Sequence, residues 1–333
     1  MRRWFPFVLA LVIVFSITPA NAATPADTLV MAWQFDDIIT LDPAEIFEFS
    51  GAEYAGNTYD RLIGYEVEDV SKIYGIAAES WSVSPDGKTY TFKIRKGITF
   101  ASGNPLTAED VAFSLQRTVI LDKSPAFILG QFGFTADNVR DQIRAVDAST
   151  VTIETDQAYA PTFVLYCLTA TVGSVVDKKE VMAHEKDGDL GHAWLRTNYA
   201  GSGPFKLKQW KASEILILDA NTSYWDGAPS LKRVIIRHIA EQATQRLLVE
   251  KGDIDIARNL GPDQIRGLEG NSDVRIHSSP KGGIFYLGLN QKHEALKKPQ
   301  VRQALKYLVD YDGIANTILK GSMVAHQAFL PIG

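Results

Sequence analysis

The chain has 333 residues and a formal net charge of −5, from 34 Lys and Arg against 39 Asp and Glu. This length accommodates two domains. The mild acidity argues against a nucleic acid or an anionic membrane as the partner, because both require a basic protein face. The 16 Phe, 12 Tyr and 6 Trp residues suit a large core, and also a cleft in which flat side chains line an apolar pocket.

The N-terminus has the pattern of a secretory signal peptide. Arg2 and Arg3 precede an almost continuously apolar run, residues 4–17, and Ala20-Asn21-Ala22 provides an A-x-A cleavage site. A membrane anchor is the alternative, but the run is shorter than the ~20 residues that a span prefers. We therefore expect removal of residues 1–22, by the general secretory route rather than the twin-arginine route. Without a Cys at the cleavage site, a soluble periplasmic protein is expected and not a lipoprotein.

Residues 28–111 predict a strand, a helix, and then a hairpin that leads into a second helix. The first strand covers residues 28–33, and residues 51–62 have helical spacing. Ser84-Pro85-Asp86-Gly87 is a turn signal, because Pro presets φ and Gly tolerates positive φ. Alternation then places Tyr90, Phe92 and Ile94 on one face of a strand. Thr107 is a helix N-cap with a carboxylate three residues on, as in a capping box.

Shorter elements are predicted in the middle of the chain. Residues 124–140 indicate a surface connection, and residues 143–155 alternate as a hairpin. A helix from residue 160 carries Cys167, the only cysteine in the sequence. A lone Cys cannot form an internal disulfide, so we expect a buried free thiol. A catalytic nucleophile is the alternative, and no neighbouring residue supports it.

The last third predicts further strands and helices. Two glycines in residues 201–203 permit a tight backbone path before a strand, and a phosphate loop is excluded because no helix and no Lys-Ser/Thr pair follows. Strands are expected over residues 231–239 and 253–256, and a helix over residues 242–250.

The order of these parts closely resembles the signature of the large extracytoplasmic solute-binding proteins of ABC importers, the oligopeptide, dipeptide and nickel-binding family. In that family a W-x-x-x-x-D-G-x-x-Y-x-F-x-L-R-x-G-x-x-F segment precedes an L-T-A-x-D-V helix start. This chain supplies Trp81, Asp86, Gly87, Tyr90, Phe92, Arg95, Gly97, Phe100, Leu106, Thr107, Ala108, Asp110 and Val111. Ile94 replaces the usual Leu, which is a conservative change.

Further matches extend the resemblance over residues 23–333. Residues 201–207 match the family's G-T-G-P-[FY]-x-[LF], and residues 221–227 its N-x-x-[YF]-W-x-G. By the same resemblance residues 174–177 and 284–290 correspond to strands, and residues 299–305 to the x-x-V-R-x-A-[LI] helix. In that helix Val301, Leu305 and Leu308 form an apolar stripe that predicts a core contact, while Arg302 is expected to pair structurally. The resemblance implies an α/β fold with two lobes, of the periplasmic binding protein kind (type II, cluster C). Residues 23–240 would form lobe I with the family's extra subdomain, and residues 241–333 part of lobe II, with a hinge near residues 239–241.

The resemblance also implies where a solute is held. In the family the segment after the D-P turn, here residues 44–50, enters the ligand cleft. The ligand-binding candidates are Phe47, Glu48, Phe49, Ser50, Thr171 and Tyr286. Glu48 would meet a cationic group between aromatic walls, although a solvated Glu48 beside helix-end packing is the alternative. For Thr171 the alternative is an ordinary helix terminus, and Tyr59 and Asp60 are expected to be structural.

By resemblance, the function is capture of a solute in the periplasm and its delivery to the membrane subunits of an ABC permease. Peptides are the commonest cargo in the family. A nickel chelate, heme, an opine or an oligosaccharide on the same scaffold is the alternative, as is a truncated fragment without function. A monomer is expected, with no cofactor and no nucleic acid as partner.

An enzyme is the competing class. The sequence has no nucleophile elbow, no H-E-x-x-H motif and no His/Cys cluster with metal-ligand spacing. His184 and His192 lie on a polar stretch and are expected to be solvated rather than to act as ligands. No catalytic residue and no metal site are therefore expected.

Relatives in the family continue beyond the point that matches residues 329–333, a loop within lobe II. The resemblance thus implies an incomplete member, whose missing portion would complete lobe II and supply an Asp for a peptide ammonium and basic groups for its carboxylate. A lobe of about ninety residues buries barely enough surface to offset its chain entropy. We therefore expect the 333-residue chain to bind peptides weakly and to be less stable than a full-length relative.

Overall fold

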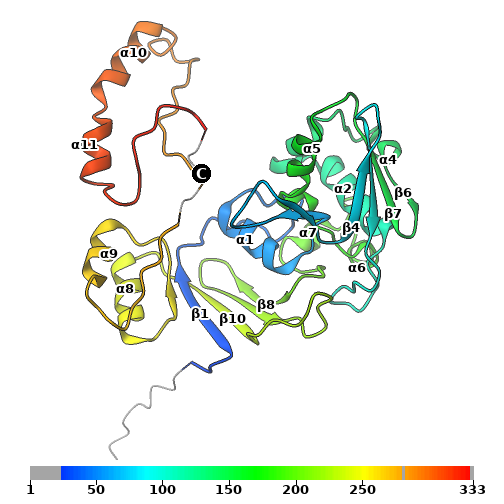
Figure 1. Ribbon diagram of the computed structural model, residues 1–333, viewed down its shortest axis with the longest axis horizontal. Coiled ribbons are helices and arrows are strands. Elements are labelled where there is room, and N and C mark those ends of the chain that lie inside the picture. The colour runs from blue at the N-terminus through cyan, green and yellow to red at the C-terminus, as the bar shows by residue number, and fades with distance from the viewer. Residues whose placement is uncertain (1–23, 280–281, 331–333) are drawn as a thin grey trace, which may run out of the picture.

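The computed structural model describes residues 24–279 and 282–330 (Figure 1). The predicted signal peptide, residues 1–22, and its cleavage site before Ala23 lie outside these residues. The described chain is a mixed α/β fold with sheets of five, four and two strands. The predicted α/β class is therefore confirmed.

The five-stranded sheet has the order β11-β1-β10-β9-β8. Its strands are β1 (Thr28–Trp33), β8 (Phe205–Lys211), β9 (Ile215–Ala220), β10 (Arg233–His238) and β11 (Ile256–Ala257). β1 is parallel to both β10 and β11, whereas the β10–β9 and β9–β8 pairs are antiparallel. The carboxyl ends of β1, β10 and β11 consequently lie at one edge of the sheet. The strands predicted over residues 28–33 and 231–239 are confirmed.

Each face of this sheet packs against its own core. On one face Leu216, Leu218, Val234 and Ile236 are buried in a cluster with Trp33. On the other face Val30 and Ala32 pack against Ile254, which follows the helix of residues 242–251. Alternation of side chains along the strands produces these two faces.

The four-stranded sheet, at the right of Figure 1, has the order β4-β5-β7-β6. Its strands are β4 (Ala78–Val83), β5 (Thr89–Ile94), β6 (Ile143–Asp147) and β7 (Thr150–Glu154). Both predicted hairpins are confirmed, and Tyr90, Phe92 and Ile94 are buried together as the alternation requires. Helix α2 (Ala108–Leu121) begins with the predicted capping box, in which the Thr107 amide and hydroxyl both donate to Asp110 Oδ2, at 2.9 and 2.7 Å.

Short helices and one small hairpin complete the part before residue 200. They are α1 (Phe49–Thr58), β2 (Ile63–Tyr65), β3 (Ile73–Gly75), η1 (Ser124–Ala126), α3 (Phe127–Gly130), α4 (Val139–Gln142), α5 (Pro161–Leu168), η2 (Thr171–Gly173), α6 (Lys178–Ala183) and α7 (His192–Leu195). The helices predicted from residues 51 and 160 are confirmed, with shifted ends.

Two predictions for this part are wrong. Residues 124–140 are not a surface connection, because Leu129, Phe132 and Val139 are buried in the core of the four-stranded sheet. The apolar side chains occur there at helical and turn spacing, which a periodicity search over longer windows misses. Residues 174–177 form an isolated bridge at Ser174 rather than a strand, and Asp177 instead accepts from the Glu180 amide at the start of α6.

The cysteine prediction also needs correction. Cys167 is only half-buried, and Gln131 Nε2 lies 3.5 Å from its Sγ. Partial burial raises the pKa of the thiol above its ordinary value, and the contact from Gln131 opposes this shift. The thiolate is therefore disfavoured, which agrees with a structural residue rather than a nucleophile.

The Asp60 carboxylate, just after the end of α1, connects this helix to distant loops through hydrogen bonds. Asp60 is 2% exposed and accepts from Ser202 Oγ, Tyr224 OH and Trp225 Nε1, at 2.8, 2.9 and 3.2 Å. Burial raises the pKa of Asp60 above its ordinary value, while these three donors lower it. The structural role expected for Tyr59 and Asp60 is confirmed, since Tyr59 is equally buried.

After β10 the chain forms α8 (Gln242–Lys251), then β11, and α9 (Pro262–Leu268). Gly252 ends α8 in the left-handed conformation, with φ of 74°. The strand predicted over residues 253–256 is only two residues long and pairs with β1. Residues just beyond the expected hinge thus return to the same sheet as β1.

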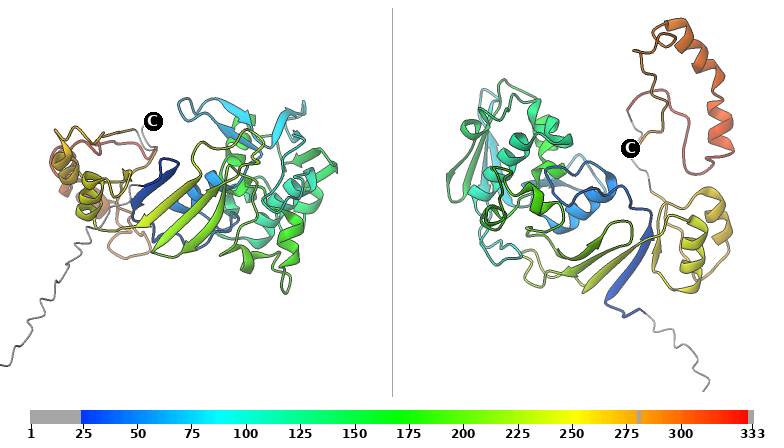
Figure 2. Two further views of the ribbon diagram at one scale, coloured as in Figure 1. Left: turned by 90° about the horizontal axis from the view of Figure 1, so that it is seen from below. Right: turned by 180° about the vertical axis from the view of Figure 1, so that it is seen from behind.

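Residues 282–330 contain α10 (Pro299–Leu308) and α11 (Tyr311–Asn316), and lie apart from the sheets in Figure 1 and in the right view of Figure 2. The strand predicted over residues 284–290 is wrong, because no described strand pairs with it and Phe285 is 78% exposed. The helix is confirmed, but its stripe is not a core contact, since no residue of α10 is buried and Leu308 is 79% exposed. Arg302 donates to the carbonyl oxygens of Leu296 and Lys297.

Candidate functional site

Four of the six predicted ligand-binding residues lie together where the loop after β1 enters α1. Phe47 and Phe49 are 59% and 72% exposed, so neither belongs to the core. The Phe47 ring packs edge to face against Phe127 of α3, with ring centroids 5.6 Å apart. The Ser50 amide donates to Asp37 Oδ2 at 3.3 Å. This arrangement presents exposed aromatic surface beside a charged loop.

Glu48 is not fully solvated, so the alternative interpretation of this side chain is wrong. Its Oε2 accepts from the Phe47 amide at 2.9 Å, and its Oε1 is buried without a hydrogen-bond donor among the described residues. Gly51 makes this placement possible, because a Cβ at that position would lie 2.6 Å from Glu48 Oε1. A buried carboxylate oxygen without a donor raises the free energy of the folded state. Glu48 Oε1 therefore has capacity for a further hydrogen bond.

The remaining two candidates are separated. Thr171 Oγ1 donates to the Ile46 carbonyl at 3.2 Å, which places Thr171 beside residues 47–50. Tyr286 is 62% exposed and packs edge to face on Phe329, in the segment of residues 282–330. The structure therefore brings five candidates together, and within the described residues Tyr286 has no hydrogen bond or ring contact with them.

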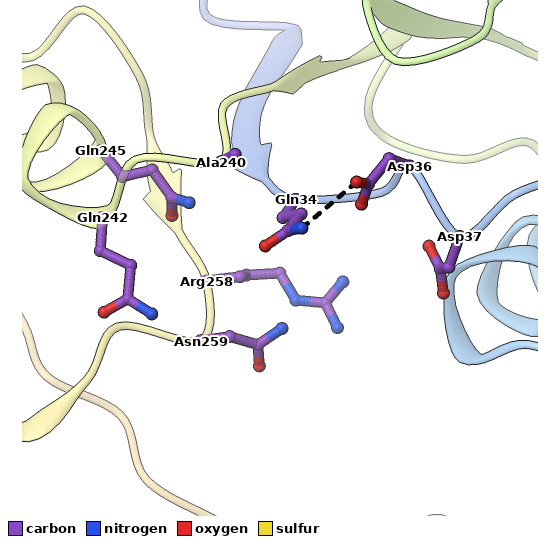
Figure 3. A pocket seen from close by; sticks show the side chains of 8 residues that line it. All are labelled: Gln34, Asp36, Asp37, Ala240, Gln242, Gln245, Arg258 and Asn259. Carbon is purple, nitrogen blue, oxygen red and sulfur yellow. Dashed lines mark hydrogen bonds between the residues drawn. The ribbon is translucent and has the colours of Figure 1, made fainter.

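A pocket of about 280 Å³ adjoins this cluster (Figure 3). Three chain segments line it, each at the carboxyl end of a parallel strand of the five-stranded sheet: the loop after β1, the connection from β10 into α8, and the turn after β11. The lining residues are Gln34, Asp36, Asp37, Ala240, Gln242, Gln245, Arg258 and Asn259. Ligands of open α/β sheets bind outside the carboxyl ends of strands, so the position is typical of a binding site.

Arg258 connects the pocket to α1. Its Nη1 bonds both carboxylate oxygens of Glu53, with 2.5 Å to Oε1, and its guanidinium lies 4.4 Å from the centroid of the Trp33 ring. Both ion-pair partners are one-third exposed, so water and solute reach them. The pair and the ring together hold the Arg258 side chain across the pocket.

The pocket and the predicted cluster are parts of one surface. Asp37 lines the pocket and accepts from Ser50, while Glu53 stands one helical turn after the cluster and pairs with Arg258. Sequence reasoning missed Gln34, Asp37 and Arg258. The signal that points to them is the position of each within four residues after a predicted strand, combined with the knowledge that those strands are parallel.

A buried ion pair supports the loop that carries this surface. Arg117 of α2 donates from Nη1 and Nη2 to the two oxygens of Asp42, at 2.7 and 2.6 Å, and both side chains are at most 1% exposed. Asp42 also accepts from the Ala44 amide at 3.0 Å, and Arg117 Nε donates to the Leu190 carbonyl. The D-P turn is thereby fixed to α2.

The expectation for His192 is wrong. Its Nε2 lies 2.9 Å from Glu45 Oε2, and the two side chains are only 15% and 20% exposed. His184 is more exposed and stacks on the Trp194 ring, 4.3 Å between centroids. The contact from His192 adds a second connection to residues 44–50, so this histidine supports the loop.

None of the helices within residues 24–279 and 282–330 has the length and apolar character needed to cross a membrane.

Curated relatives match nearly the whole chain. The probable D,D-dipeptide-binding periplasmic protein DdpA of Escherichia coli is 34% identical over 331 residues, covering 98% of this chain and 62% of that protein. The dipeptide-binding protein of Escherichia coli is 26% identical and covers 85% of this chain and 54% of that protein. The chain therefore spans about three fifths of the length of these relatives.

Solved structures agree with the fold. The periplasmic binding protein DppA from Helicobacter pylori, in complex with the peptide STSA, superposes with a TM-score of 0.76 at 26% identity, over 88% of this chain and 58% of that one. OppA of Haemophilus influenzae gives a TM-score of 0.77 at 22% identity, which concerns the fold alone. The family model of bacterial extracellular solute-binding proteins, family 5 (middle), matches residues 72–333. The chain belongs to this family of extracellular solute-binding proteins.

Proposed function

We propose that this chain is the periplasmic solute-binding component of an ABC importer, which captures peptides and delivers them to the permease in the membrane. The observation that carries the proposal is the polar pocket at the carboxyl ends of β1, β10 and β11, next to exposed aromatic residues. A peptide has many backbone donors and acceptors, two charged ends and variable side chains, and this surface offers partners for each kind of group.

The composition of the surface favours a peptide over the other solutes on the same scaffold. Amide side chains of Gln34, Gln242 and Asn259 supply donors and acceptors for a peptide backbone. The Phe47 and Phe127 rings supply an apolar wall for a side chain. The candidates Glu48, Phe49, Ser50, Thr171 and Tyr286 belong to the proposal as parts of the same ligand surface, with Tyr286 contributed from beyond the hinge.

Two lobes that close around the solute are the proposed mechanism, with residues 23–240 in lobe I and residues 241–333 in lobe II. The connection of residues 239–241 lies directly between β10 and α8. Ala240 and Gln242 in this connection line the pocket, so a bound solute would contact the hinge itself. The protein would act as a monomeric binder without catalysis and without a nucleic-acid partner.

The proposed function has a direct test. With a dipeptide such as Ala-Ala at one hundred times its dissociation constant, the purified protein should gain about 2.7 kcal/mol of stability, because the ligand binds only the folded state. Thermal unfolding with and without the peptide measures this gain, and chromatography of the peptide afterwards checks that it is not hydrolysed. Hydrolysis of the peptide would contradict the proposal. So would a dipeptide panel of which no member stabilises the protein.

Export provides a separate prediction. The mature protein isolated from the periplasm should begin at Ala23, because Ala20-Asn21-Ala22 fits the cleavage rule. N-terminal sequencing measures this, and an Ala22→Tyr variant should accumulate uncleaved because a bulky residue does not fit the cleavage site. A periplasmic form that starts at Met1, or a lipid-modified N-terminus, would show that the protein is anchored instead.

A further inference from the structure

We propose that a second pocket, where α7 and the residues after it meet β8 and the loop after β1, binds a small organic carboxylate with an apolar body. Its volume is about 350 Å³, within the range of about 300–1,000 Å³ that is usual for small-molecule sites. The lining residues are Ile39, His192, Ala193, Arg196, Thr197 and Trp210, none of which lines the pocket of Figure 3. The inference concerns a separate site and does not depend on the proposed function.

Arg196 supplies the positive charge of this second pocket. Its side chain is 53% exposed, so a solute can reach the guanidinium. The nearest carboxylate is that of Glu45, whose Oε2 lies 3.8 Å from Arg196 Nε but only 2.9 Å from His192 Nε2. Within residues 24–279 and 282–330 the guanidinium makes no hydrogen bond. Nη1 and Nη2 of Arg196 therefore retain their donors, and this planar fork matches the two oxygens of a carboxylate.

The rest of the second pocket has a marked apolar share. Ile39 is 62% exposed, although it is a large aliphatic residue, and the partly buried Trp210 ring of β8 lines the same pocket. A ligand with an apolar or aromatic body would remove both surfaces from water while its carboxylate meets Arg196. An inorganic anion would leave them exposed. The combination of one free guanidinium with apolar surface thus favours an organic carboxylate.

Hydrogen bonds and an ion pair hold the lining segments in fixed relative positions. The Leu41 amide donates to the Arg196 carbonyl at 3.0 Å, and the contact of Glu45 with His192 joins the same loop to α7. Trp210 lies opposite Leu216 in the pairing of β8 with β9. The pocket is therefore formed before a ligand arrives, which lowers the entropy that binding would cost.

Calorimetry with three probes tests the chemical class of the ligand: benzoate, its neutral isostere benzamide, and acetate. We expect benzoate to bind at least about five times more tightly than benzamide, because only benzoate carries the charge that pairs with Arg196. We expect a similar ratio over acetate, which lacks the apolar body. Equal binding of benzoate and either of the other probes would overturn the proposed class. Absence of benzoate binding would overturn the site itself.

Three variants make the test specific to the second pocket. In Arg196→Gln the preference for benzoate over benzamide should fall to within about twofold, since glutamine keeps a polar side chain without the charge. Arg144→Gln is the matched control, because it removes an exposed arginine of β6 and should keep the full preference. Arg258→Gln should keep it as well, and its loss there would assign benzoate to the pocket of Figure 3. Retention of the preference in Arg196→Gln would likewise overturn the assignment.

Discussion

Replacement of Arg117 by alanine is expected to lower the free energy of unfolding by about 3–5 kcal/mol, because it leaves the buried Asp42 carboxylate without its counter-charge. Asp42 is 0% exposed and accepts hydrogen bonds from Nη1 and Nη2 of Arg117. The Asp42–Arg117 pair joins the D-P turn to α2, so its loss should also loosen residues 44–50 and weaken ligand binding.

Urea unfolding of the purified variant measures the effect, and the chain supplies a matched control. Arg233 pairs with Asp219 at 2.7 Å, but these side chains are 45% and 35% exposed. An exposed pair contributes at most about 1 kcal/mol, so Arg233→Ala should change stability little. Equal losses in the two variants would contradict the role assigned to the buried pair.

A double replacement separates the cost of an unpaired charge from the value of the pair. In an Asp42→Leu/Arg117→Met variant no buried charge remains, so part of the stability lost in Arg117→Ala should return. The Leu190 carbonyl loses its donor in both variants, whereas the Ala44 amide loses its acceptor only in the double variant, at a cost of about 1–3 kcal/mol. A double variant as unstable as Arg117→Ala would indicate that these backbone contacts dominate.

The sequence was sufficient for those elements whose signals are local. The hairpin of residues 78–94 has its turn residues and its alternation within a few positions, and the capping box at Thr107 spans three. The Asp42–Arg117 pair joins residues 75 positions apart, and no pattern in one sequence connects them. The pocket could not be predicted for the same reason, because it forms only when the distant segments β1, β10 and β11 become parallel neighbours in the sheet.

Residues 284–290, where the predicted strand does not form, show the same limit of sequence-based prediction. Here the local pattern is present, but a partner for it is not. Its apolar composition fits a strand, yet a strand is stable only when a neighbour accepts its backbone hydrogen bonds. Likewise the stripe of α10 has helical spacing that predicts burial, but spacing specifies a face and not what covers it. Candidate site residues at 47–50 were found by family resemblance, whereas Asp37 and Arg258 required the sheet order.

The close backbone approach at Gly203 leads to the other large expected effect. A Cβ on Gly203 would lie 2.5 Å from the Thr58 carbonyl carbon, 2.7 Å from the Thr58 oxygen and 2.8 Å from the Tyr59 nitrogen. These are backbone atoms at the end of α1, and the Gly203 amide donates to the Thr58 carbonyl at 3.0 Å. No side chain can move aside to relieve the contact, so the two segments must separate.

Gly203→Ala should therefore lower the free energy of unfolding by about 1–3 kcal/mol through overpacking, and Gly203→Val by more. Gly56 is the matched control: it lies within α1 with open space around its Cβ position, so Gly56→Ala should raise stability by roughly 0.5–1 kcal/mol. A Gly→Ala replacement is thus expected to lower the free energy of unfolding at position 203 and to raise it at position 56. Urea unfolding of both variants beside the parent measures this difference, and destabilisation by Gly56→Ala equal to that by Gly203→Ala would contradict the packing account, since only Gly203 has backbone atoms in the way.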